Sequence, residues 1–163
     1  MKLTSSVLVL ICAGLASCVS APKISSSFNP SDAAFIHLQG KGAIKGQAFL
    51  RRNDGIVVYA AGSDVVLIPK TTYSTERINA LYGSGKINYY IPSPESPPGF
   101  ESATRQTKAN GEGRFEFPNL ADGDYYVVTK VTWMAGNMPQ GGALMERAQI
   151  RAGATAEIIM SGQ

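Results

Sequence analysis

Cysteine and histidine are nearly absent from this chain, and their scarcity limits the chemistry it can support. The 163 residues include two cysteines and one histidine. Both cysteines, Cys12 and Cys18, lie near the amino terminus, so the remainder has no disulfide. A zinc site needs three or four converging ligands, and a serine hydrolase would have to use His37. The sequence therefore predicts no metal site, no cofactor and no catalytic residues, with His37 partly exposed at the start of the first strand.

The chain also lacks any run of basic residues, although its formal net charge is +3. Nucleic-acid binding would need lysine and arginine clustered on one face or in one run, so no nucleic-acid partner is expected. The acidic pair in residues 122–124 is too small for calcium, which takes about six or more oxygen ligands. The glycine-rich residues 110–113 precede no helix that would hold a phosphate. Both segments are interpreted as turns.

A hydrophobic run long enough to span a bilayer is missing as well. One cation, Lys2, precedes an apolar run from Val7 to Leu15. About 20 apolar residues are needed to cross a membrane as a helix, so this run is too short. The order of charge and apolar run is typical of a secretory signal.

Leu15, Ala16 and Ser17 run directly into Cys18. This pattern resembles the lipobox of bacterial lipoproteins, which implies a signal peptide over residues 1–17 and lipids on Cys18. Two or three acyl chains would attach the protein permanently, because one chain alone binds only reversibly. Val19 follows where an aspartate would favour the inner membrane, so the resemblance implies the outer membrane, facing the periplasm. The alternative is an ordinary signal peptide with Cys18 left as a free thiol.

The rest of the chain divides into a tether and one domain. Residues 18–40 are rich in serine and proline without apolar periodicity, which predicts a flexible tether after the lipidated cysteine. Residues 41–163 contain short apolar runs separated by Gly, Asn, Asp and Pro. Such runs predict an all-β sandwich or barrel.

Several strands can be placed within this domain by their patterns. Ile44, Gly46, Ala48 and Leu50 alternate with polar residues, as in a half-buried strand. Residues 53–55 suit a tight turn before a strand at 56–60. Residues 64–69 are apolar without alternation, which predicts a central strand covered on both sides. A closing hairpin is expected about residues 152–153, between the last two strands.

The most informative stretch runs from residue 110 to residue 134. After the glycine turn, Phe115 and Phe117 share one face of a strand, and Leu120 is placed to close the end of the core. The strand that follows puts Tyr125 and Trp133 on one face with the intervening alternate residues. This face is expected to join the core, because each large aromatic buries on the order of 150–250 Å².

The sequence "GRFEFPNLADGDYYV" resembles the carboxypeptidase regulatory-like domain, with a resemblance over about residues 43–160. The resemblance implies a transthyretin-like (prealbumin-like) Greek-key sandwich of about seven strands, without the catalytic half of those enzymes. Lys108 stands where the family usually has an aspartate, and the pair 112–113 is extra. The motif residues are Gly111, Phe115, Phe117, Leu120, Gly123, Tyr125 and Trp133.

A long connection over residues 70–105 departs from the strand pattern, and long loops inside compact domains are often functional. Its first part, residues 75–83, is expected to form a short helix capped by Thr75. Its second part combines aromatics with four prolines over residues 87–100. The candidate partner-binding residues are Tyr82, Tyr89, Tyr90 and Phe100. Alternatively, these aromatics lie back on the sandwich and cover a sheet edge.

The sequence thus predicts a non-catalytic interaction module in the bacterial envelope, held to the membrane by its lipid. Three functional classes stay open for it. The domain could dock a protein of an envelope assembly, as a transthyretin-like lipoprotein does in the type VI secretion system. It could bind carbohydrate or peptidoglycan through the aromatic loop, or it could be a hydrolase of unrecognised type. The motif specifies a fold better than a function.

Overall fold

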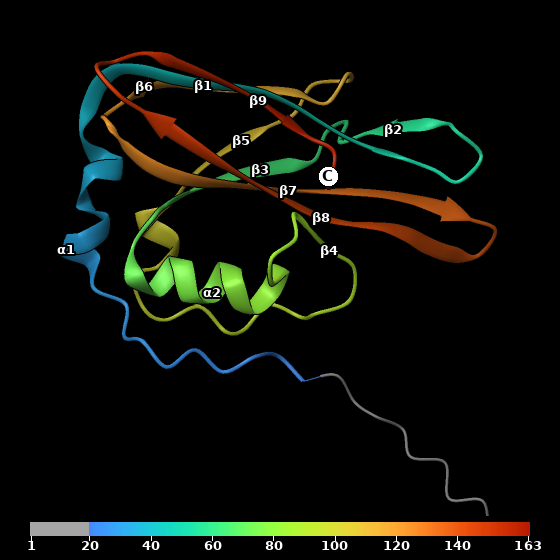
Figure 1. Ribbon diagram of the computed structural model, residues 1–163, viewed down its shortest axis with the longest axis horizontal. Helices are drawn as coiled ribbons and strands as arrows, with labels where there is room; N and C mark the ends of the chain where they lie inside the picture. Colours follow the sequence, from blue (N-terminus) through green and yellow to red (C-terminus); the bar gives the residue numbers. More distant parts are fainter. Residues whose placement is uncertain (1–19) are drawn as a thin grey trace, which may run out of the picture.

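The protein is a sandwich of two β-sheets, with a helix packed beneath the second sheet (Figure 1). The structure is a computed structural model that describes residues 20–163. Cys18 and the predicted signal peptide lie outside the described residues. The predicted β-sandwich is confirmed, although residues 20–163 form nine strands where about seven were expected. Two of the nine are very short: β2 has three residues and β4 has two.

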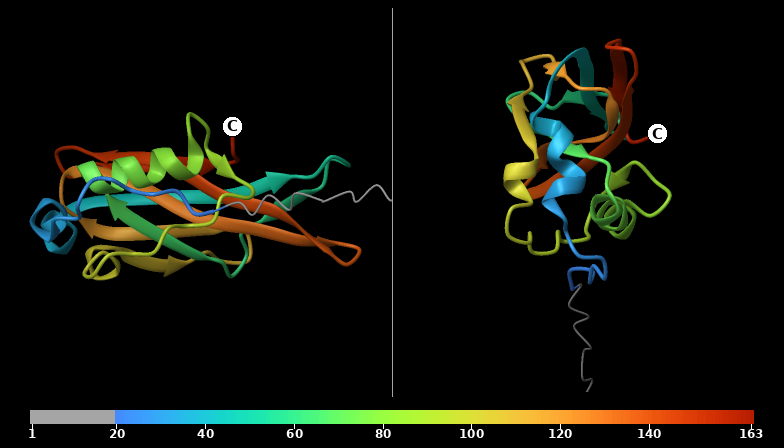
Figure 2. Two further views of the ribbon diagram at one scale, coloured as in Figure 1. Left: turned by 90° about the horizontal axis from the view of Figure 1, so that it is seen from below. Right: turned by 90° about the vertical axis from the view of Figure 1, so that its left-hand side faces the viewer.

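The first sheet contains β1 (Gln39–Arg51), β2 (Val57–Tyr59), β6 (Arg114–Leu120) and β9 (Thr155–Met160). The second sheet has the order β4 (Ile87–Asn88), β8 (Met138–Ile150), β7 (Gly123–Ala135), β3 (Asp64–Pro69) and β5 (Arg105–Lys108). The β1–β2 and β7–β8 hairpins both project at the same end of the molecule (Figure 2). Along β1 the predicted alternation is confirmed, with Ile44, Ala48 and Leu50 buried.

Strand β7 is buried on both faces over much of its length. Tyr125, Val127 and Val131 join the core between the sheets, as predicted. Tyr126 was expected on the outer face, yet it is only 1% exposed. It belongs to a second core, beneath the sheet, that also contains Ile68, Tyr73, Ile78 and Met145. This second core forms because the long connection supplies a helix that covers the outer face.

That helix is α2 (Thr72–Tyr82), which begins three residues earlier than predicted. Thr71 is the N-cap: its Oγ1 accepts a hydrogen bond from Ser74 N at 3.1 Å, while Ser74 Oγ accepts one from Thr71 N at 2.8 Å. Thr75, the predicted cap, lies inside the helix with its hydroxyl 3.1 Å from the Tyr126 hydroxyl. Within residues 20–163, no helix has the length and apolar character needed to cross a membrane.

The segment expected to be a flexible tether is instead packed on the domain from about Ile24 onward. Phe28 makes edge-to-face contacts with Tyr73 and Phe100, with ring centroids 5.6 and 5.5 Å away. The short helices α1 (Pro30–Ala33) and η1 (Ala34–His37) follow, and Ile36 enters the first core. Composition suggested a linker because the apolar residues are few, but Ile24, Phe28, Phe35 and Ile36 pack against the two cores of the domain.

Strands β8 and β9 do not form the predicted closing hairpin. After residues 152–153 the chain crosses between the sheets, and β9 pairs in parallel with β1. Asp122 holds this crossing, because its carboxylate accepts hydrogen bonds from Ala152 N at 2.7 Å and Gly153 N at 2.9 Å. Both residues have positive φ, 53° and 69°. The turn residues 152–153 were therefore predicted correctly, but they did not indicate which strand β9 pairs with.

The glycine turn before β6 also joins the two sheets, since β5 pairs with β3 and β6 pairs with β1. Asn110 Oδ1 accepts hydrogen bonds from Glu112 N and Arg114 N, both at 2.9 Å. Gly113, not the motif residue Gly111, is the constrained glycine. Its φ is 72°, and a Cβ there would collide with the carbonyl oxygen of Ala48. A Cβ on Gly111 would meet nothing within 4 Å.

We therefore expect Gly113→Ala to destabilise the fold and Gly111→Ala to leave it nearly unchanged. The first substitution adds a backbone collision and a strained φ, with an expected cost of about 1–3 kcal/mol. The second lies at an open surface turn, where changes stay within about 0.5 kcal/mol. Urea unfolding of both variants measures the difference. Equal losses of stability would contradict this account of the turn.

A second prediction concerns Glu76, which ties the N-terminal segment to α2. The Ser26 side chain beside the carboxylate, with hydrogen bonds from Ser25 and from Ser26 N, lowers the pKa of Glu76 to about 2. Three hydrogen bonds reach the Glu76 carboxylate, from Ser25 N, Ser25 Oγ and Ser26 N at 2.6–2.8 Å. The Ser26 hydroxyl lies nearby but forms no hydrogen bond within residues 20–163. A lowered pKa means that this attachment is present above pH 4.5, the ordinary value, and is lost as the pH falls through about 2.

The amide resonances of Ser25 and Ser26 should therefore titrate with a midpoint near pH 2 in an NMR acid titration. In the Glu76→Gln variant this transition should vanish from both amides. A midpoint at the ordinary glutamate value would show that the carboxylate does not hold the segment.

Candidate ligand-binding groove

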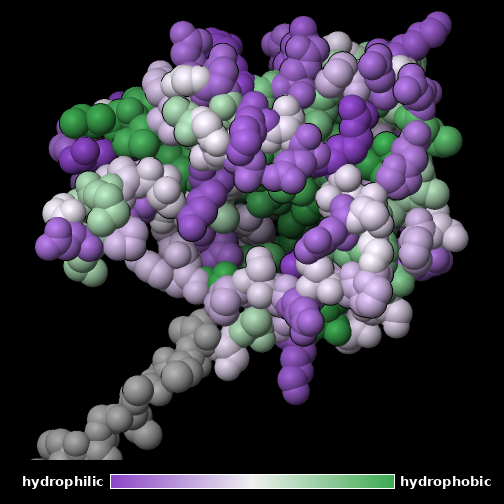
Figure 3. All heavy atoms as spheres, turned by 180° about the vertical axis from the view of Figure 1, so that it is seen from behind, coloured by the Kyte–Doolittle hydropathy of each residue, from purple (hydrophilic) through white to green (hydrophobic). Residues whose placement is uncertain are grey.

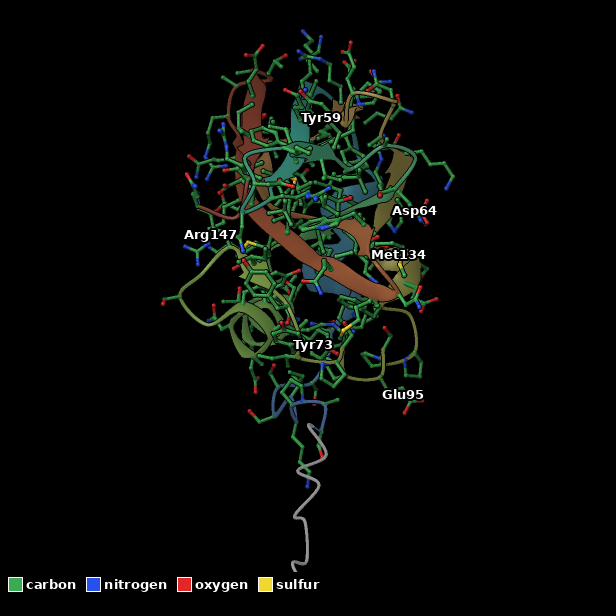
Figure 4. All side chains as sticks on the ribbon, turned by 90° about the vertical axis from the view of Figure 1, so that its right-hand side faces the viewer. Tyr59, Asp64, Tyr73, Glu95, Met134 and Arg147 are labelled. Atoms are coloured by element: carbon green, nitrogen blue, oxygen red, sulfur yellow. The ribbon has the colours of Figure 1, made fainter. Side chains whose placement is uncertain are left out.

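An open groove of about 880 Å³ lies at the end of the sandwich where the two hairpins project. Its walls come from the β1–β2 hairpin, the β7–β8 hairpin and the residues that follow β4. Figure 4 looks onto this end, with Met134 on the β7–β8 hairpin, Tyr59 above it and Tyr73 below. Hydrophobic and hydrophilic residues lie side by side there (Figure 3, left). The groove thus offers both apolar surface and polar groups to a ligand.

Three aromatic side chains line the groove. Tyr89 and Tyr90 are 57% and 85% exposed, and their ring centroids lie 5.9 Å apart with planes inclined at 37°. Trp133 is half-buried against the first core. Its indole N–H donates no hydrogen bond to any residue in 20–163, so it is available to a ligand.

Asn88 fixes the backbone that presents the two tyrosines. Its Oδ1 accepts hydrogen bonds from Tyr90 N at 3.1 Å and Ile91 N at 2.8 Å, and its Nδ2 donates to Ile91 O at 2.8 Å. Asparagine favours such local turns because its side chain mimics the backbone. These hydrogen bonds fix the backbone of the turn, so Tyr90 is held at an exposed position.

Two glycines of β8 allow its neighbouring strands β7 and β4 to approach it closely. Gly141 has φ 107°, and a Cβ there would collide with the carbonyl oxygen of Val131 on β7. A Cβ on Gly142 would lie 2.9 Å from the carbonyl oxygen of Asn88 on β4. The next residue outward, Gln140, is in register with Trp133. An amide side chain is thus placed across from the indole in the groove wall.

The charged residues of the groove come from two places. The β1–β2 hairpin supplies Arg51, Arg52 and Asp54, and β7 supplies Lys130. Arg52 is paired with Asp54, with 2.6 Å between the guanidinium nitrogen and the carboxylate oxygen. Among residues 20–163, neither Arg51 nor Lys130 has a hydrogen-bond or ion-pair partner for its side chain.

Only part of the predicted partner-binding set lies in the groove. Tyr89 and Tyr90 do, but Tyr82 and Phe100 are each 7% exposed and belong to the second core. Phe100 packs edge-to-face on Tyr73 at 5.3 Å, and burial raises the pKa of Tyr82. For these two residues the alternative is correct in that they lie back on the sandwich, but they cover the face of the second sheet beneath β7 and not a sheet edge.

Most residues of the family motif are part of the core or of its close packing. Phe115, Phe117, Leu120 and Tyr125 are buried in the first core. The Tyr125 hydroxyl donates to Ala121 O at 2.8 Å, and burial raises its pKa. Gly123 lies under Phe35, whose ring would be 2.6 Å from an added Cβ.

The remaining candidates for chemistry are dispersed or committed to structure. Within residues 20–163, no group of three or more His, Cys, Asp or Glu side chains converges on one point. His37 is exposed in η1. Hydrogen bonds from Gln149 at 2.7 Å and Arg151 at 2.8 Å lower the pKa of Asp124, so this carboxylate links β7 to β8.

Sequence reasoning missed the role of Trp133 and all the charged residues of the groove. Trp133 was assigned to the core by alternation, but β7 pairs with β3 only as far as Thr129 and then continues past the sandwich. One signal was present in the sequence: residues 131–145 contain no charged residue, although many belong to a projecting hairpin. No local pattern indicated that Arg51 and Lys130, which come from different sheets, would line the same groove.

The comparisons with known proteins support the fold. No model of a known protein family matches the chain, and no curated protein matches its sequence. A crystal structure from Pseudomonas aeruginosa, described as that of a "putative carbohydrate binding protein", matches with a TM-score of 0.71 and 21% identity. The match covers 83% of this chain and 98% of that one. At this identity the likeness shows a shared β-sandwich; the regulatory-like family stays a prediction from the motif.

Proposed function

We propose that this chain is a non-catalytic carbohydrate-binding protein whose groove takes a saccharide. One observation carries the proposal: Trp133, Tyr89 and Tyr90 surround an open groove in which amide and charged side chains are also exposed. Sugar rings have apolar C–H faces and polar edges, so aromatic faces beside hydrogen-bonding groups suit them. The likeness in fold to a structure described as carbohydrate-binding agrees with this proposal.

The groove predicts which substitutions weaken binding. Trp133→Ala and Tyr90→Ala should each weaken retention on polysaccharide about two- to twelvefold, because each stacking contact contributes roughly 0.5–1.5 kcal/mol. The assays are pull-down on purified peptidoglycan and affinity electrophoresis through a panel of soluble polysaccharides. The matched control is Tyr59→Ala, since Tyr59 is also exposed but lies outside the groove.

Wild-type protein retained by none of these polymers would refute carbohydrate binding. Equal loss from Tyr59→Ala and Trp133→Ala would refute the groove as the site. A photo-crosslinker at Tyr89 in living cells gives an independent readout. A single discrete protein adduct there would instead favour a docking lipoprotein of an envelope assembly.

The lipobox resemblance supports a lipid anchor at Cys18, and we include that anchor in the proposal. Cys18→Ser should release the protein into the soluble periplasmic fraction, because no acyl chain can then be attached to sulfur. Cell fractionation with immunodetection measures this. Continued sedimentation of the Cys18→Ser variant with the outer membrane would contradict lipid anchoring.

A further inference from the structure

We infer that the groove selects acidic saccharides, whose rings carry carboxylate or sulfate groups, over neutral ones. This inference rests on the proposed function and names the class of ligand. It comes from the charges of the groove, which are few, of nearly one sign, and partly without partners in residues 20–163.

The aromatic walls contribute no charge of their own. Residues 87–94, which carry the two tyrosines, and residues 131–145, which carry Trp133, contain no lysine, arginine, aspartate or glutamate. The electrostatic character of the groove is therefore set by Lys130 and by the hairpin residues 51–54. These supply three cations against one carboxylate.

That one carboxylate is already satisfied. Asp54 pairs with Arg52 at 2.6 Å, and its other oxygen accepts a hydrogen bond from Ile56 N at 3.2 Å. Asp54 therefore neutralises its own hairpin arginine and leaves Arg51 and Lys130 with their charges uncompensated. An unpaired cation in a groove is ready to meet an anion without first breaking a contact.

The two free cations come from different sheets. Arg51 ends β1 of the first sheet, and Lys130 lies on β7 of the second sheet. Both residues line the groove together with Trp133, Tyr89 and Tyr90. Each sheet thus contributes one unpaired positive charge to the groove.

Two further grooves among residues 20–163 lack this feature. In the groove lined by β1, β5, β6 and β9, the cations are paired: Lys45 with Glu116 at 3.6 Å and Lys108 with Asp64 at 2.6 Å. The groove beside α2 is mainly acidic, with Asp32, Glu76 and Asp124 against one lysine. Unpaired cations beside aromatic rings are therefore a property of the hairpin groove.

The test compares matched probes by calorimetric titration: oligogalacturonate and the same oligomer after reduction of its carboxylates to neutral galactose units. We expect at least about tenfold weaker binding of the neutral oligomer. Binding of the acidic one should weaken between about 50 mM and about 500 mM salt, because exposed charges are screened. Sulfated dextran against plain dextran forms the second pair, and it distinguishes sulfate from carboxylate as the preferred anion.

Lys130→Gln and Arg51→Gln should each weaken binding of the acidic probe about three- to tenfold and so narrow the difference in affinity between the acidic and the neutral probe. Lys41→Gln is the control, since Lys41 is an exposed lysine outside the groove. Equal affinity for acidic and neutral members of both pairs, without salt dependence, would overturn the inference and leave the proposed function intact. An equal effect of Lys41→Gln would also overturn it, by showing general attraction to a basic protein. Binding to none of the four probes, with retention on another neutral polymer, would overturn the inference alone.

Discussion

The two-sided burial of β7 is the constraint on which the rest of the structure depends. A strand of 13 residues can be covered on both faces only if each alternate set of side chains finds its own apolar layer. One set meets β1 and β6 across the sandwich, and the other meets α2 and the chain after it. Tyr126 and its neighbours on the outer face are apolar and must be buried. The helix with its Thr71 cap buries them, together with Phe28, Tyr73 and Phe100.

The groove follows from the length of the same strand. Strand β3 pairs with β7 from Tyr125 to Thr129, whereas β8 pairs with it along its whole length to Ala135. Beyond Thr129, β7 and β8 continue as a two-stranded ribbon past the covered part of the sandwich, and β1 with β2 does the same in the other sheet (Figure 1). Side chains that would point into the core further back on the strand, such as Trp133, here point into a space open to solvent.

This difference between the middle and the end of a strand explains what the sequence could predict. Alternation located the strands and assigned Phe115, Phe117 and Leu120 to the core, because period two is a local property. It placed Trp133 on the correct face, where it is half-buried against the first core, but it left Tyr126 outside any core. Burial depends on how far the facing layer extends, which alternation does not report. The pairing partners of the strands could not be predicted either. The turn at residues 152–153 was expected, but the strand after it, β9, pairs with β1, more than 100 residues away in sequence. The prediction of Tyr82 and Phe100 as partner-binding residues is wrong because no local sequence pattern indicates the second core, to which both belong.

The same geometry gives the aromatic and the cationic side chains of the groove different roles. Trp133 is anchored at one edge by the first core, and the turn at Asn88 fixes the backbone of the tyrosines, so little entropy is lost when a ring stacks on them. Arg51 and Lys130 are exposed and unfixed, so they contribute long-range attraction and selection of charge more than tight binding. Binding strength should therefore reside in the aromatic residues and specificity in the cations.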